Sequence, residues 1–151
     1  MTAHDELQRW WEESAGKVAT ECVDEARLAG LESRYAVRLP SDFREYLSRC
    51  APVGEAGLDD QRGTEWWSFG RIKSVRDDFD GHLEPLLAVR AHEWLLFADY
   101  AAWIWAWAID CSAGADRGKI AIVGGKGYNV FVAESFSDFV TKYVADFYSV
   151  C

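Results

Sequence analysis

The chain has 151 residues, the size of one domain, and half of them are apolar, with 15% aromatic. This composition predicts a large core rich in rings and excludes a disordered chain. The net charge of −9 disfavours binding to a nucleic-acid backbone or an anionic membrane, since both require basic patches. The excess acid lies before residue 119. It favours a basic protein partner, while solubility alone also explains an acidic surface.

No apolar run approaches the ~18 residues of a membrane span, and the opening "MTAHDELQRWWEES" has no apolar signal-peptide core. We therefore expect a cytoplasmic protein with no membrane association. The four cysteines lack paired spacing, so we expect free thiols rather than a zinc ribbon or a disulfide framework. They are Cys22, Cys50, Cys111 and Cys151.

The first third of the chain predicts helices. "DELQRWWEES" predicts a short leading helix, and "KVATECVDEARLAGLESRYAV" has apolar residues at helical spacing. In "LPSDFREYLSRC", Pro40 pushes Leu39 out of the helical region, so that Ser41 can cap a new helix. Apolar residues then recur at i, i+3, i+4 and i+7 from Phe43, which gives this helix one buried face.

The middle of the chain is less regular. Residues 51–65 predict a turn-rich acidic loop, and residues 66–72 a short strand. Residues 73–93 predict a short helix mixed with irregular connections. From residue 94 the pattern changes to four strands with short links, "WLLFAD", "AWIWAWAID", "KIAIVG" and "YNVFVA", which should pair antiparallel. The last segment, "ESFSDFVTKYVADFYS", predicts an amphipathic helix capped by Ser135 and packed on the sheet.

Three tryptophans stand at every second position in "LLFADYAAWIWAWAID", at Trp103, Trp105 and Trp107. In a strand these rings point to one side, and the other side carries Ala102, Ile104, Ala106 and Ala108. A strand that is apolar on both sides is typical of the middle of a sheet, and its alanines would let the terminal helix approach closely. We expect Trp105 to be a core residue. A stacking platform for nucleic acid would need nearby lysine or arginine.

No catalytic or metal-ligand spacing is recognisable. Two groups could hold a metal ion by composition: His82, Glu84, His92 and Glu93 form one, and Asp77, Asp78 and Asp80 the other. Neither matches a known signature, and a solvated acidic loop is the more ordinary interpretation of the second. "GGKG" at 124–127 lacks the P-loop spacing and is typical of a hairpin turn. A Ser-His-Asp or Cys-His arrangement stays open, because its members need not be adjacent. We expect no enzyme activity, no cofactor and no metal.

Three segments, in order, resemble the SUKH superfamily. "LESRYAVRLPSDFREYL" resembles its opening pair of helices, "LLFADYAA" its central strand, and "VFVAESFSDFV" its closing strand and helix. The family often has FADYGG, whereas this chain has Ala101 and Ala102 in place of the glycines, and "RCAPVG" replaces a frequent Asn-Gly-Gly. The resemblance spans roughly residues 28–147. It implies a single α+β domain over residues 1–151, with helices flanking a mixed, largely antiparallel sheet.

The resemblance also implies a role. Bacterial members look like immunity proteins that bind and neutralise a cognate toxin domain, often a nuclease or deaminase, while other members are intracellular scaffold or interaction domains. Many nucleases are basic, so an acidic inhibitor with an aromatic anchor would block the active site or substrate cleft. The sequence leaves open which toxin this is and whether the chain oligomerises.

The expected interface has two parts. Trp66 and Trp67 should point to opposite sides of a strand, which would leave at most one of them fully buried and the other exposed as the anchor. The first patch of expected partner-binding residues is Glu55, Asp59, Asp60, Glu65, Trp66 and Trp67, and the second is Asp77, Asp78, Asp80 and Glu84.

Overall fold

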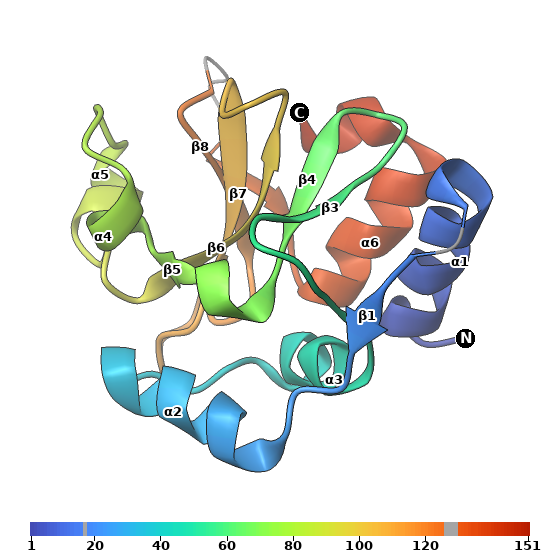
Figure 1. The fold of residues 1–151 in the computed structure, drawn as a ribbon. Helices are drawn as coiled ribbons and strands as arrows, with labels where there is room; N and C mark the ends of the chain where they lie inside the picture. The colour runs from blue at the N-terminus through green and yellow to red at the C-terminus, as the bar shows by residue number, and fades with distance from the viewer. Residues whose placement is uncertain (17, 126–129) are drawn as a thin grey trace.

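The structure is a computed structural model that describes residues 1–16, 18–125 and 130–151 (Figure 1). The described helices are α1 (Ala3–Ala15), α2 (Glu25–Tyr35), α3 (Ser41–Cys50), α4 (Val75–Asp78), α5 (Pro85–Ala88) and α6 (Phe136–Ala145), with single 3-10 turns η1 (Phe69–Arg71) and η2 (Phe147–Val150). The described strands are β1 (Thr20–Glu21), β2 (Ala51–Pro52), β3 (Gly57–Asp59), β4 (Thr64–Trp67), β5 (Lys73–Ser74), β6 (Trp94–Tyr100), β7 (Trp105–Asp110), β8 (Ile120–Val123) and β9 (Phe131–Ala133).

The sheet has seven strands in the order β3-β4-β6-β7-β8-β9, and β5 pairs with β6 beyond the end of β4. All described pairings are antiparallel, including the separate ribbon of β1 and β2. The predicted α+β fold with a largely antiparallel sheet is confirmed. The predicted strand over 128–133 begins outside the described residues, as does part of the predicted turn at 124–127.

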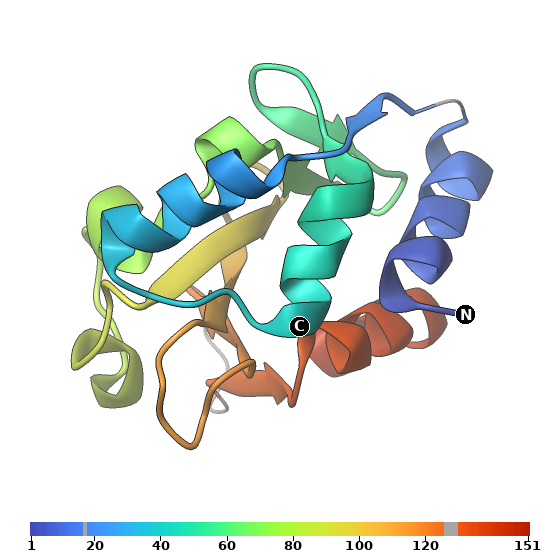
Figure 2. The same cartoon turned by 90° about the horizontal axis from the view of Figure 1, so that it is seen from below.

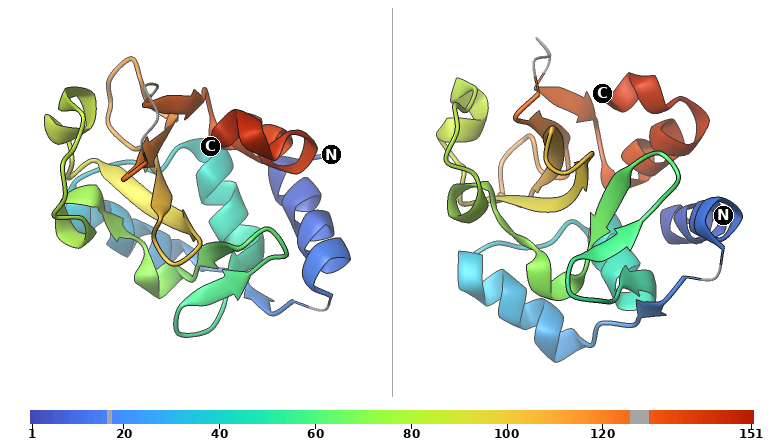
Figure 3. Two further views of the ribbon diagram at one scale, coloured as in Figure 1. Left: turned by 90° about the horizontal axis from the view of Figure 1, so that it is seen from above. Right: turned by 45° about the horizontal axis from the view of Figure 1, so that its top comes forward.

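One face of the sheet is covered by α6, with α1 and α3 beside it (Figures 2 and 3). Phe139 and Tyr143 of α6 pack against Trp66, at centroid distances of 6.0 and 5.0 Å, and against Trp107, at 5.4 and 6.1 Å. The terminal helix therefore lies on the side of the tryptophan rings. The expectation that it approaches the alanine side of β7 is wrong, because the large rings and not the small residues face the main core.

The starts of α2, α3 and α6 each have a local cause in the sequence. The helix predicted over residues 17–37 begins only at Glu25, because the Asp24 carboxylate caps it, accepting the backbone N–H of Arg27 at 2.8 Å. The residues before it pair instead with β2, as strand β1. Ser41 is the first residue of α3 and not its cap, since Pro40 takes the cap position. The predicted cap of α6 is confirmed: Ser135 accepts the backbone N–H of Asp138 at 3.0 Å.

The turn between β6 and β7 is left-handed. Ala101, Ala102 and Trp103 have φ values of 48°, 55° and 70°, and β7 starts only at Trp105. The strand predicted over 102–110 was therefore too long, and Trp103 belongs to the turn. A left-handed backbone favours glycine, so these angles fit the glycines of the FADYGG phrase that the segment resembles.

Replacing both turn alanines should stabilise the protein. The double variant Ala101→Gly/Ala102→Gly removes two side chains from a left-handed backbone that disfavours them by about 1–2 kcal/mol each, less the greater unfolded-state freedom of glycine. We expect a net gain of about 1 kcal/mol and a rise in Tm of about 2–4 °C, measured by circular dichroism. Ala29→Gly, at an exposed position of α2, is the control and should lower stability by about 1 kcal/mol. A lower Tm in the turn variant would contradict the left-handed turn.

Candidate functional site

The two neighbouring tryptophans of β4 are both buried. Trp66 is 0% exposed and Trp67 is 1% exposed, because both faces of the sheet are covered at this point. Trp66 lies against α6. On the opposite face, the Nε1–H of Trp67 donates to Asp99 at 2.7 Å, and the Arg71 guanidinium lies 4.1 Å from the Trp67 ring centroid. The expectation that one ring of this pair is exposed as an anchor is wrong.

Asp60 is also an interior residue, 8% exposed. Its Oδ2 accepts hydrogen bonds from the indole N–H of Trp10 at 3.3 Å and of Trp66 at 3.0 Å, and from the Tyr143 hydroxyl. Its Oδ1 accepts the backbone N–H groups of Arg62 and Thr64 at 2.9 and 3.2 Å. The carboxylate thus joins α1, β4 and α6 from inside, and it does not belong to the surface to which the sequence assigned it.

The environment of Tyr143 agrees with this role. Burial, and then the charge of Asp60, raises the pKa of the Tyr143 phenol far above its usual value. The hydroxyl therefore keeps its proton and remains a donor to Asp60.

Three carboxylates lie in a row across β3, β4 and β6. Asp59 is directly opposite Glu65, and Glu65 is directly opposite Asp99. Among the described residues, one cation forms ion pairs with this row: Arg71 pairs with Glu65, and with Asp99 at 3.3 Å. Asp59 and Glu65 open onto a recess of about 490 Å³. Its other lining residues are Gly63, Arg71, Asp99, Ala102 and Trp103.

The second acidic patch meets the first through an aromatic stack. Phe79 stands between the exposed carboxylates of Asp78 and Asp80, and its ring stacks on Trp103 with a centroid distance of 5.7 Å and an interplanar angle of 7°. On its other side, Trp103 lies 6.1 Å from the Trp67 ring. The next residue, Ile104, is 60% exposed. We call this region the acidic–aromatic surface; its members are Asp59, Glu65, Asp78, Phe79, Asp80, Trp103 and Ile104.

Three expected partner-binding residues, Asp77, Glu55 and Glu84, do not belong to this surface. Asp77 is exposed on α4, where its carboxylate accepts a hydrogen bond from the Tyr35 hydroxyl at 2.8 Å. Glu55 is exposed but shares a recess with the cations Arg27 and Lys73, so its surroundings are not acidic.

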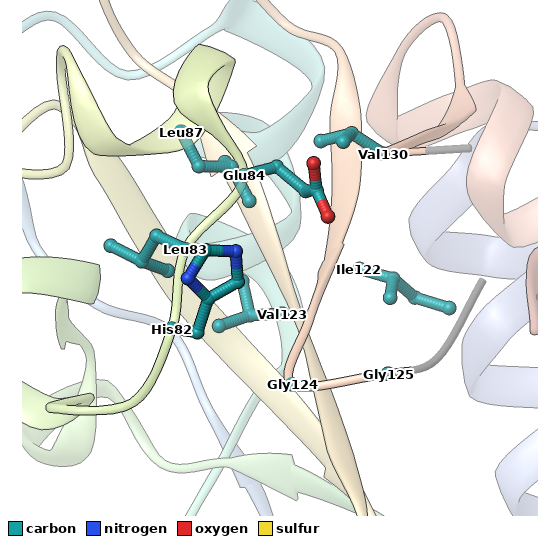
Figure 4. A pocket seen from close by; sticks show the side chains of 9 residues that line it. All are labelled: His82, Leu83, Glu84, Leu87, Ile122, Val123, Gly124, Gly125 and Val130. Atoms are coloured by element: carbon teal, nitrogen blue, oxygen red, sulfur yellow. The ribbon is translucent and has the colours of Figure 1, made fainter. Parts of the chain in front are cut away.

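Glu84 lines a small cavity together with His82 (Figure 4). The remaining walls of this cavity are mostly apolar and include Leu87, Ile122 and Val130. Its volume of about 50 Å³ suits one or two water molecules, whereas small-molecule sites enclose roughly 300–1,000 Å³. The cavity does not have the size of a substrate site.

Three further findings concern the described residues as a set. Among them, no group of three or more His, Cys, Asp or Glu side chains is placed to hold a metal ion. Within the same ranges, none of the helices has both the length and the apolar character needed to cross a bilayer. The predicted free thiols are confirmed for all four cysteines.

Comparison with known families decides where the fold belongs. The model of the SMI1 / KNR4 family (SUKH-1) matches residues 22–142. The chain belongs to the SMI1/KNR4 family. The resemblance seen in the sequence is thus confirmed, and the SMI1/KNR4 family includes toxin immunity proteins. No curated protein matches the chain.

The SMI1/KNR4 segment contains the whole acidic–aromatic surface, whereas α1 precedes it. This helix is nonetheless part of the same core. Trp11 is 0% exposed and packs against Trp66 at 5.7 Å, and Trp10 donates to Asp60. In this chain the SMI1/KNR4 core is therefore completed by a helix from outside the matched segment.

Proposed function

We propose that this SMI1/KNR4 chain is an immunity protein that binds a bacterial toxin domain and neutralises it. The toxin is a basic nuclease or deaminase, and the complex covers its active site or substrate cleft. The chain acts in the cytoplasm, by binding and not by catalysis, and uses no cofactor. Membership of a family that includes toxin immunity proteins supports the role, and the acidic–aromatic surface supports the basic partner.

The row of aligned carboxylates is the observation that carries the proposal. Like charges directly opposite each other on neighbouring strands destabilise a sheet. Here Asp59, Glu65 and Asp99 face one another with a single arginine between them. Arg71 offsets part of this charge and Asp99 is buried, so the negative charge that remains at Asp59 and Glu65 is the part that favours a cationic surface and speeds association with it.

Co-expression tests the role. Each toxin-like domain found encoded beside the gene for this chain is induced in cells that carry either this chain or an empty vector. We expect the chain to restore growth and to co-purify with the toxin domain. A non-cognate toxin domain from another locus serves as the control and should still kill. If the chain protects against no adjacent toxin and instead co-purifies with several cellular proteins, the scaffold alternative replaces the immunity role.

A further inference from the structure

We propose that the β6–β7 turn is the anchor of the partner interface, with Ile104 and Trp103 pressed into a basic protein surface. This inference rests on the proposed immunity function and deepens it, because it assigns the contact surface. It moves the aromatic anchor away from Trp66 and Trp67, which are buried.

The turn presents an apolar centre that is already held in place. Ile104 is 60% exposed, so its side chain is open to contact with a partner. Its N–H donates to the carbonyl of Tyr100 at 2.9 Å, and the N–H of Trp103 donates to Oδ2 of Asp99 at 2.9 Å. The half-buried Trp103 ring is stacked on Phe79. Because the turn backbone and the Trp103 ring are fixed before binding, the complex loses little affinity to ordering them.

Acidic side chains flank this centre on two sides. Asp59 and Glu65 lie across the recess that Trp103 lines, and Asp78 and Asp80 flank the ring stacked on Trp103. In the described part of the chain, no Lys or Arg lies within 4 Å of the carboxylates of Asp59, Asp78 or Asp80. An apolar centre inside a charged rim is the usual anatomy of a protein interface.

Charge decides which partner fits. A second copy of the chain would place acid against acid, and a nucleic acid would place phosphate against acid. Both are disfavoured by Coulomb repulsion. A protein surface rich in Lys and Arg neutralises the rim and buries the apolar centre at the same time, so it is the occupant we assign.

The decisive experiment uses two opposite charges at one position. The probe is the adjacent toxin domain, purified with its catalytic residue inactivated, and binding is measured by surface plasmon resonance. Ile104→Lys and Ile104→Asp both remove the apolar contact, but only the lysine repels a basic partner. We expect Kd to rise about 100-fold for Ile104→Lys and about 10-fold for Ile104→Asp. Position 104 is exposed, so both variants should unfold at the wild-type temperature.

The contribution of the flanking acidic residues is tested by the rates of association and dissociation. Asp59→Lys should slow association about tenfold at low salt and flatten its salt dependence, with a smaller effect on dissociation. It should not lower the stability of the free protein, because it replaces the like-charge pair with Glu65 by an opposite pair. Two remote charge changes are the controls, and both should bind as the wild type does: Ala29→Lys on α2, at the opposite end of the molecule in Figure 1, and Glu13→Lys on α1.

The outcomes separate the two proposals. Failure of the wild-type chain to bind or protect would overturn the immunity function and this inference with it. If the wild type binds, but both Ile104 variants bind within about twofold of it, the function stands and the assigned surface is wrong. Equal losses for Ile104→Lys and Ile104→Asp would overturn the basic character of the partner surface.

Discussion

Replacing Asp60 with alanine should cost about 3–5 kcal/mol of unfolding free energy. The change leaves the indole N–H of Trp66 and the backbone N–H of Thr64 without their acceptor in the interior, and each such loss costs about 1–3 kcal/mol. The Tyr143 hydroxyl keeps Thr64 Oγ1 as an acceptor at 2.7 Å. It also removes the hydrogen bond that the indole N–H of Trp10, in α1, donates to this carboxylate. We expect Tm to fall by roughly 10 °C in a thermal melt.

The neighbouring Asp59 provides the matched control. Its side chain is exposed and has no hydrogen-bond partner among the described residues, so Asp59→Ala should change stability by less than about 0.5 kcal/mol. Asp60→Asn keeps one acceptor oxygen and should fall between the two. Equal melting temperatures for Asp59→Ala and Asp60→Ala would show that Asp60 is not the internal junction of α1, β4 and α6.

Trp107→Ala should be the most damaging change in β7, with a cost of about 3–5 kcal/mol. The ring is 0% exposed, packs against Phe139 and Tyr143, and donates its Nε1–H to the carbonyl of Val150 at 2.8 Å. Trp105, two residues earlier, is only half-buried and stacks on Tyr100 at 4.4 Å. Trp105→Ala should therefore cost only about 1–2 kcal/mol.

Urea denaturation of both variants gives this comparison directly. Which variant loses more unfolding free energy shows which of the two rings is buried more deeply beneath α6. If Trp105→Ala were the more damaging, the ring at 105 and not the ring at 107 would lie under α6. The expectation from sequence that Trp105 is a full core residue would then be restored.

Periodicity predicted those elements whose signals are local. The amphipathic spacing from Phe43 predicted α3, the apolar run from Trp94 and the tryptophan alternation after it predicted the central strands, and Ser135 marked the start of α6. The helix predicted over residues 17–37 is too long at its start, because Asp24, a common cap residue, begins α2 at Glu25.

The candidate site was predicted less well, because it depends on what covers each face of the sheet. Alternation correctly predicts that Trp66 and Trp67 point to opposite faces of the sheet. It does not predict that Arg71 and Trp103 cover the face on which Trp67 lies. The position of Trp103 follows from the left-handed turn. The glycines that related sequences carry there could have revealed it, because they indicate positive φ.

The packing of α1 on α6 has a consequence for synthesis. These two helices are separated by about 120 residues in the chain. Across their contact, the Thr141 hydroxyl donates to the Glu6 carboxylate at 3.4 Å. At about 5–20 residues per second, a ribosome leaves α1 waiting roughly 6–24 s for its partner. During that interval α1, whose Leu7 and Trp11 are fully buried in the finished protein, has α3 to pack against but lacks α6. Each new molecule therefore reaches its complete native packing only after translation has passed α6.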